Sequence, residues 1–75
     1  MNKKQKKQLD NLIIDYLRDR GKSHELKVAD DLSERFEGKL HAATVLVRID
    51  RMKKSNELRH EAKAVHDTMV WAKKL

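Results

Sequence analysis

The 75-residue sequence contains no cysteine, only two glycines and only three aromatic residues. Without cysteine, the chain can form neither a disulfide nor a thiolate metal site, and such a composition suits a reducing compartment. Gly21 and Gly38 stand alone, so the chain has no glycine-rich loop of the kind that binds phosphate. The scarcity of aromatic side chains also argues against base stacking as a means of binding RNA.

The sequence has no long apolar run either, and its lysine-rich beginning lacks the apolar stretch of a signal peptide. We therefore expect a soluble, cytoplasmic protein without a membrane partner. A chain of this length forms one small domain, which buries about 60–65% of the surface of its unfolded chain. A catalytic cleft between two lobes does not fit in a domain of this size.

The sequence does have an excess of positive charge, with a formal net charge of +6. Residues 39–54 hold five cations and one acid, whereas residues 25–38 hold five acids and two cations. Such a separation is what a polyanion-binding surface requires, although lysine-rich ends also simply keep small proteins soluble. We expect residues 1–7 to be a flexible basic arm and residues 8–75 to be the domain. The arm could add non-specific phosphate contacts through its four lysines, Lys3, Lys4, Lys6 and Lys7.

The spacing of apolar residues predicts three helices. The first runs from Leu9 and stops at Gly21, and the second begins with Ser23 as its N-cap and stops at Gly38. The apolar residues of the second helix are Leu26, Ala29, Leu32 and Phe36. From all three helices and the segment that follows, the expected core consists of Leu12, Ile13, Leu17, Leu32, Val45, Ile49, Met52 and Leu58.

The predicted third helix has two unlike faces. Val45, Ile49 and Met52 follow the i, i+4, i+7 spacing of a buried stripe. Val47 lies on the opposite face with no core to fill, which argues against a plain solvated surface. Asn56 follows, and asparagine can take the left-handed conformation that ends helices. The outward face carries small, hydroxylated and basic side chains, namely Ala43, Thr44, Val47, Arg51 and Lys54.

The order of these parts is Thr44-Val45, then Arg48-x-x-Arg51-Met52, a stop at Asn56 and then Leu58. It resembles the recognition helix of winged helix-turn-helix DNA-binding proteins. The resemblance implies an α+β fold with three helices and a C-terminal β-hairpin, the wing. It also implies sequence-specific binding of double-stranded DNA by the third helix in the major groove, as in a small transcriptional or replication regulator. The second helix departs from the pattern, since it continues past Leu32 to Phe36.

The same resemblance assigns roles to individual side chains. Arg51 can donate two hydrogen bonds to guanine, and Thr44 or Val47 can contact a thymine methyl group, while Ala43 allows close approach. Arg48 is a further candidate, although its place beside the buried stripe would also let it pair with Asp31 or Glu34. Phosphate contacts are expected from Lys39, His41, Lys54, Arg59 and Lys63.

Two patterns compete in the last stretch of the chain. Thr68, Val70 and Trp71 favour a strand, which predicts a hairpin that turns at His66-Asp67. A helical seam also runs through Leu58, Ala62, Val65, Met69 and Ala72. With that seam the chain would be an all-α four-helix domain, acting as a protein-interaction or dimerisation module. The chain could also be an RNA- or ribosome-associated factor, and it could form a homodimer.

No pattern in the chain indicates catalysis. Residues 23–25 (Ser-His-Glu) are consecutive, so their side chains point in different directions and cannot form a nucleophile–base pair. Asp30 and Asp31 are explained as solvated acids. The four histidines include no i, i+4 pair, and His60 facing His66 across a hairpin would still need further zinc ligands. We expect no enzymatic activity, metal, cofactor or small-molecule substrate.

Overall fold

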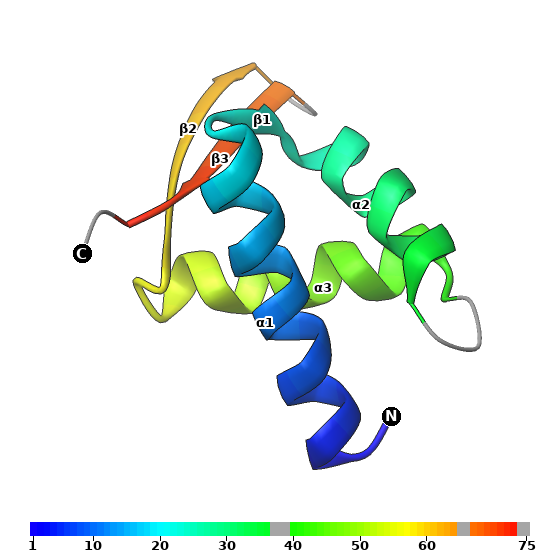
Figure 1. The fold of residues 1–75 in the computed structure, drawn as a ribbon. Helices are drawn as coiled ribbons and strands as arrows, with labels where there is room; N and C mark the ends of the chain where they lie inside the picture. The colour runs from blue at the N-terminus through cyan, green and yellow to red at the C-terminus, as the bar shows by residue number, and fades with distance from the viewer. Residues whose placement is uncertain (37–39, 65–66, 74–75) are drawn as a thin grey trace.

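The computed structural model describes residues 1–36, 40–64 and 67–73. Figure 1 shows three helices that cross one another and an antiparallel sheet that packs beside the end of the first helix. This is the α+β arrangement of three helices and a C-terminal hairpin predicted from the sequence, and the all-α alternative is wrong. The elements in chain order are α1 (Lys3–Arg20), β1 (Ser23–His24), α2 (Glu25–Arg35), α3 (Ala42–Lys54), β2 (Leu58–Ala64) and β3 (Asp67–Ala72).

The strands β2 and β3 form an antiparallel hairpin. Leu58 pairs with Ala72 and Ala62 pairs with Thr68, with a register shift between Ala62 and Ala64. Leu58 and Val70 are the buried residues of the two strands, and of the seam residues that the structure describes only Leu58 is buried. The predicted turn lay at residues 66–67. Asp67 is the first residue of β3, and residues 65–66 lie outside the described part of the chain.

A short strand that the sequence did not indicate completes the sheet. Ser23 pairs with Val70 and His24 pairs with Met69, which gives the strand order β1-β3-β2. The prediction of Ser23 as a helix N-cap was wrong, because its hydroxyl donates to the carbonyl of Gly21 at 2.9 Å. His24 is the N-cap instead, and its Nδ1 accepts from the amide of Leu26 at 3.2 Å. Gly21 ends α1 at a φ of 76°, where a side chain would be strained.

The lysines near the N-terminus lie on a helix. Asn2 caps α1 by accepting from the amide of Gln5 at 2.8 Å, and the Gln5 side chain accepts from the Asn2 amide at 3.1 Å. This reciprocal capping satisfies two backbone donors that a helix start leaves open. Residues 3–7 therefore belong to α1 in this structure, and the flexibility expected of residues 1–7 stays a prediction. In Figure 1 the first turns of α1 project past α3.

One core joins all three helices and the sheet. All the predicted core residues are buried except Leu12, whose exposed fraction is 37%. At about 100° per residue, Leu12 falls at the edge of the stripe that α1 buries through Leu9, Ile13, Tyr16 and Leu17. Leu26 is also exposed. The remaining buried apolar residues are Val28, Ala29, Leu32 and Phe36 with α2, Val45, Ile49 and Met52 on α3, and Leu58 and Val70 in the sheet.

Candidate nucleic-acid interface

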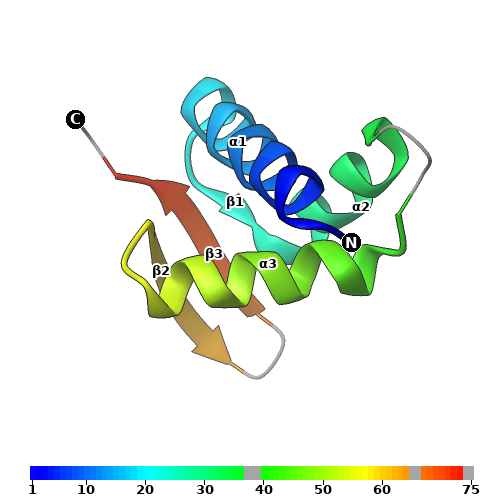
Figure 2. The same cartoon turned by 90° about the horizontal axis from the view of Figure 1, so that it is seen from below.

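Helix α3 turns one of its faces outward. The predicted buried stripe of Val45, Ile49 and Met52 is at most 1% exposed, so the opposite side of the helix faces away from the core. Seen from below in Figure 2, α3 lies across the front of the molecule. On its outward side Val47 is 60% exposed, which is the largest exposure of any large apolar side chain in the described residues. Of the other predicted members of this face, Ala43, Arg51 and Lys54 are exposed and Thr44 is half-buried.

Asn56 determines how the chain leaves this helix. Its φ of 64° is left-handed, as the sequence predicted. The amide of Asn56 donates to the carbonyl of Lys53 at 3.2 Å, and the amide of Glu57 donates to that of Met52 at 2.9 Å. This pair of bonds is a Schellman motif, which satisfies carbonyls that the helix end leaves free. The reversal sends the chain directly into β2, so the hairpin begins beside the end of α3.

Arg48 is engaged within the protein. Its Nε donates to Oδ1 of Asp10 at 2.9 Å, and its second guanidinium nitrogen donates to Oδ2 at 2.6 Å. The two side chains are 16% and 18% exposed. The hydrogen bond to Asp10 raises the pKa of Arg48 above its usual value. The predicted partners Asp31 and Glu34 were wrong, and a guanidinium held in this way to α1 is a poor candidate for contacting DNA.

The lysines at the end of α3 are also paired. Lys53 lies 3.1 Å from a carboxylate oxygen of Glu25 on α2, and its side chain is only 15% exposed. Lys54 is 79% exposed and lies 3.1 Å from Asp50 one turn earlier. A hydrogen bond from Lys54, with the charges of both lysines, lowers the pKa of Asp50. Asp50 therefore stays ionised and offsets part of the positive charge of this helix end.

Arg51 differs from these three cations. It is exposed, and its side chain forms no hydrogen bond or ion pair with any residue in the described ranges. It lies one helical turn after Val47, so the two side chains share the outward face. Arg51 also lines a surface hollow of about 450 Å³ at the end of α3, together with Lys54 and Glu57. All five guanidinium N–H donors of Arg51 are thus available to a ligand.

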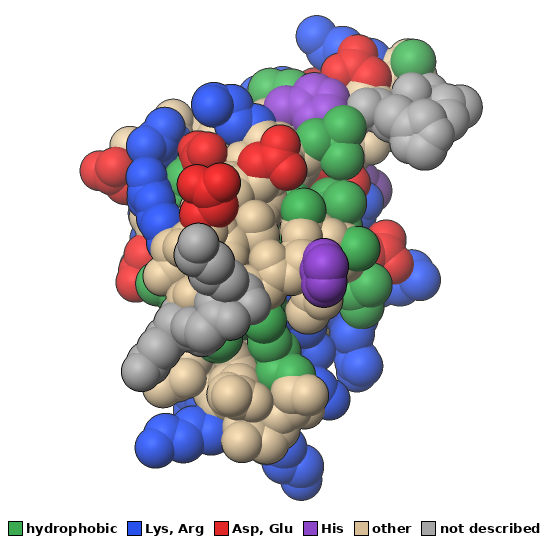
Figure 3. Space-filling view, turned by 90° about the vertical axis from the view of Figure 1, so that its right-hand side faces the viewer, with side chains coloured by type: hydrophobic (Ala, Val, Ile, Leu, Met, Phe, Trp, Pro, Cys, Tyr) green, Lys and Arg blue, Asp and Glu red, His purple; other side chains and the backbone are tan. Residues whose placement is uncertain are grey.

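The lysine-rich turns of α1 flank this face. In Figure 2 the start of α1 points toward the viewer beside α3. Lys3, Lys4 and Lys7 are exposed and Lys6 is half-buried, and the first turn of α1 contains no acid. On the face seen in Figure 3, lysine and arginine side chains occupy the lower end without acidic ones, whereas acidic and basic side chains lie side by side higher up. The positive charge therefore extends from the outward face of α3 to the beginning of α1.

The remaining predicted site residues are distributed around the fold. His41 is exposed at the N-cap of α3 and makes no side-chain capping bond. Arg59 and Lys63 are exposed on β2, and Arg59 lies opposite Trp71 in the sheet. Lys39 lies outside the described residues. Phosphate contacts from these four side chains stay a prediction.

Two further observations bear on the histidines and on the membrane. His60 pairs with Val70 in the sheet, while the suggested opposite residue, His66, lies outside the described residues. Among the described residues there is no cluster of three or more His, Asp or Glu side chains that could hold a metal ion. In the same residues no helix combines the length and the apolar composition needed to cross a membrane.

Comparison of the chain with models of known protein families, with curated protein sequences and with solved structures finds no match.

Proposed function

We propose that the protein binds double-stranded DNA in a sequence-specific manner by inserting α3 into the major groove. The observation that carries this proposal is Arg51, an exposed arginine without a partner in the described residues, on the same helix face as the exposed Val47. An α-helix fits the major groove, and a helix of 13 residues is about 20 Å long, which spans several base pairs. The protein would act in the cytoplasm as a small transcriptional or replication regulator.

The side chains of this face have complementary tasks in the proposed complex. Arg51 donates two hydrogen bonds to N7 and O6 of a guanine, which distinguishes this base from the other three. Val47 and Thr44 offer methyl groups to a thymine methyl, and Ala43 leaves room for the helix to approach. Exposure of Val47 to water is unfavourable, and contact with a base removes its surface from water.

The lysines of α1 have a different task. Lys3, Lys4 and Lys7 are exposed on the first turns of α1, which start beside α3 (Figure 2), and in the proposed complex they meet phosphates of the duplex. Contacts to phosphate release counterions and add affinity for any DNA sequence. Base contacts from α3 would then select the site, while α1 contributes general affinity.

The test compares two variants of α3 on two duplexes. A preferred site is first selected from a randomised duplex pool, and affinities for that site and for random DNA are measured by fluorescence anisotropy at two salt concentrations. Arg51→Ala should cost about 1–3 kcal/mol more on the preferred site than on random DNA. Lys54→Ala, the matched control, should weaken both duplexes alike because it contacts only phosphate.

Two results would contradict the proposal. Equal losses on both duplexes in Arg51→Ala would make α3 a phosphate-binding helix that does not select sequence. If the wild-type protein shows no salt-sensitive binding to any duplex, the DNA-binding function itself is wrong. In that event the exposed Val47 would favour a different function, a protein-interaction or dimerisation surface on α3.

A further inference from the structure

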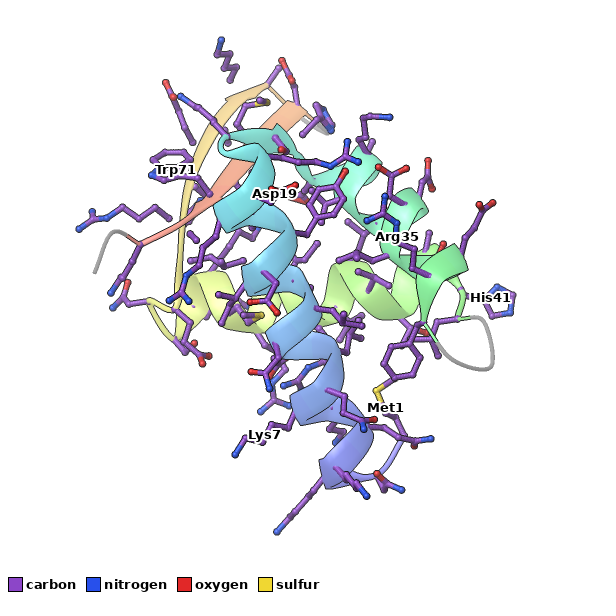
Figure 4. The ribbon with its side chains drawn as sticks, in the orientation of Figure 1. Met1, Lys7, Asp19, Arg35, His41 and Trp71 are labelled. Carbon is purple, nitrogen blue, oxygen red and sulfur yellow. The ribbon has the colours of Figure 1, made fainter. Side chains whose placement is uncertain are left out.

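The only tryptophan of the chain borders a second basic surface. Trp71 lines a hollow of about 950 Å³ between the end of α1 and β3, which we name the tryptophan hollow. Its walls include four cations, Arg18, Lys22, Arg59 and Lys73. Figure 4 shows Trp71 on β3 beside the end of α1, above α3. Among the described residues, none from α3 lines this hollow, so it lies apart from the outward face of α3, while Arg59 also belongs to the predicted phosphate contacts.

A smaller hollow of about 460 Å³ adjoins the first one. It shares Arg59, Trp71 and Lys73 with the tryptophan hollow and also contains Asn56 and His60. The indole and two cations therefore stand between two connected depressions. A ligand that extends over both depressions would pass directly along Trp71.

The indole is held in position by its neighbours. Trp71 is half-buried and pairs with Arg59 across the hairpin. The ammonium of Lys22 lies 4.8 Å from the ring centroid, and the same ammonium lies 2.7 Å from a carboxylate oxygen of Glu61. Gly21 leaves open space at the rim, since a Cβ built on it would meet nothing within 4 Å. The ring is thus fixed before any ligand arrives, which lowers the entropy cost of binding.

Lys22 is paired with Glu61, and the other three cations around the ring are available to a ligand. Arg18, Arg59 and Lys73 form no ion pair with any residue of the described part of the chain. No acid lines either hollow in that part of the chain. A neutral small molecule would not need three unpaired cations, and a purely ionic ligand would not need the indole. An aromatic ring among cations matches a base joined to phosphates, because bases stack on aromatic rings while phosphates meet Lys and Arg.

We propose that the tryptophan hollow binds a short stretch of single-stranded DNA, with a base stacked on Trp71 and phosphates on Arg18, Arg59 and Lys73. The choice of DNA, as against another nucleic acid, rests on the proposed duplex-binding function of α3. The sequence argued against stacking because aromatic residues are scarce. One indole placed between two depressions is nevertheless enough for one or two nucleotides.

The experiment uses Trp71 as its own reporter, since it is the only tryptophan. Wild-type protein is titrated with an oligodeoxythymidylate of eight nucleotides, and the tryptophan fluorescence is recorded. We expect saturable quenching. An abasic strand of the same length keeps every phosphate but has no bases, so it should bind about 5- to 150-fold more weakly and leave the fluorescence unchanged.

Variants then separate stacking from charge. Anisotropy of a labelled strand should show a loss of about 5- to 150-fold in Trp71→Ala and a smaller loss in Trp71→Phe, which keeps an aromatic ring. Arg59→Gln should weaken binding and reduce its salt dependence. Lys27→Gln is the matched control, because Lys27 is an exposed lysine on α2 outside both hollows.

Several outcomes would overturn the inference. If the abasic strand binds as tightly as the oligodeoxythymidylate, the hollow binds phosphate only and no base stacks on Trp71. Equally tight binding of an oligouridylate or of an oligoglutamate peptide would exclude single-stranded DNA as its specific ligand. If the protein does not bind duplex DNA but the tryptophan fluorescence is still quenched, the proposed function of α3 is wrong and the tryptophan hollow still binds single strands. If the fluorescence is not quenched but the protein still binds duplex DNA, the inference about the tryptophan hollow is wrong and the proposed function of α3 stands.

Discussion

Arg48 and Arg51 lie three positions apart on one helix, and their surroundings give them different roles. Arg48 lies at the edge of the buried stripe, where both carboxylate oxygens of Asp10 receive its donors. Arg51 is about 300° further round the helix, so it is turned outward and has no partner among the described residues. The first fastens α3 to α1, and the second is available to a ligand.

The ion pair of Asp10 and Arg48 should contribute measurably to stability. Asp10→Ala leaves a mostly buried guanidinium without its acceptor, so the free energy of unfolding should fall by about 1–3 kcal/mol in urea denaturation. Combining Asp10→Leu with Arg48→Met, which replaces the pair with apolar side chains, should restore most of the loss. A loss within experimental error in Asp10→Ala would show that solvent screens the pair.

The hydrogen bond between Tyr16 and Asp31 should make the free energy of unfolding depend on pH in the acid range. The hydroxyl of Tyr16 donates to Oδ2 of Asp31 at 2.5 Å and joins α1 to α2. This hydrogen bond is the main reason that the pKa of Asp31 is lowered below its ordinary value of 3.8, and the nearby cations Lys27, Arg20 and Arg35 lower it further. A lowered pKa in the folded state stabilises the fold above pH 3.8, and this stabilisation is lost as the pH falls through the folded value.

Tyr16→Phe removes that hydrogen bond and keeps the ring in the core. We expect the variant to be less stable than the wild type at about pH 6 and to approach it as the pH falls below 3.8, in chemical denaturation at a series of pH values. Leu12→Ala, a surface change on the same helix, should leave the pH dependence unchanged. If the difference in free energy of unfolding between Tyr16→Phe and wild type is the same at every pH, the hydrogen bond does not depend on the ionisation of Asp31.

At the scale of the element, substitutions on the buried and the outward face of α3 should have different effects on the free energy of unfolding. Ile49 is fully buried, so Ile49→Ala removes methyl groups from the core and should cost about 2–5 kcal/mol. Val47→Ala is the control in the same helix, and its effect on stability should stay within about 0.5 kcal/mol because Val47 is 60% exposed. Equal losses in urea denaturation would mean that both faces of α3 are covered.

Periodicity predicted the elements that have a continuous pattern. The stripe of Val45, Ile49 and Met52 fixes one face of α3, and the left-handed preference of asparagine marks its end. The strand β1 escaped prediction because two residues contain no period, and it exists only through pairing with Val70 and Met69 on β3. Helical capping at Asn2 was visible as a local signal, since Gln5 follows three residues later.

The candidate site was predictable in its residue types but not in its pairings. Arg48 pairs with Asp10 on α1 because the two helices cross at that point, and the angle at which helices cross cannot be read from a single sequence. The same applies to the tryptophan hollow. Its cations come from positions 18, 22, 59 and 73, which only the fold brings to one indole.

At the scale of the whole molecule, the positive charge falls on two separate surfaces. One surface combines the outward face of α3 with the beginning of α1, and the other surrounds Trp71 at the end of α1 and the sheet. Both ends of α1 therefore contribute cations, Lys3 to Lys7 at its start and Arg18 near its finish. The basic residues at the finish suit the negative end of the helix dipole, whereas the lysines at the start oppose its positive end.

Because these lysines lie at an unfavourable position, we predict that removing their charge raises stability and weakens DNA binding. Replacing Lys3, Lys4, Lys6 and Lys7 with glutamine keeps the helix and removes the repulsion, so the free energy of unfolding should rise by a few tenths of a kcal/mol or more at low salt. The same variant should bind selected and random duplexes more weakly by equal factors. Its plot of log affinity against log salt should flatten by about 0.9 for each phosphate that the variant no longer neutralises.

Asn2→Ala separates the position of the lysines from their charge. It removes the cap of α1 without changing any lysine, which should fray the first turn at a cost of about 0.5–2 kcal/mol to that end of the helix. If the helix holds the lysines beside α3, this variant should weaken duplex binding while the salt dependence stays close to that of wild type. Unchanged affinity in Asn2→Ala, with a loss in the glutamine variant, would show that the lysines act as a mobile charge whose fixed position on α1 is irrelevant to binding. Unchanged affinity in both variants would confine DNA binding to α3 and the hairpin.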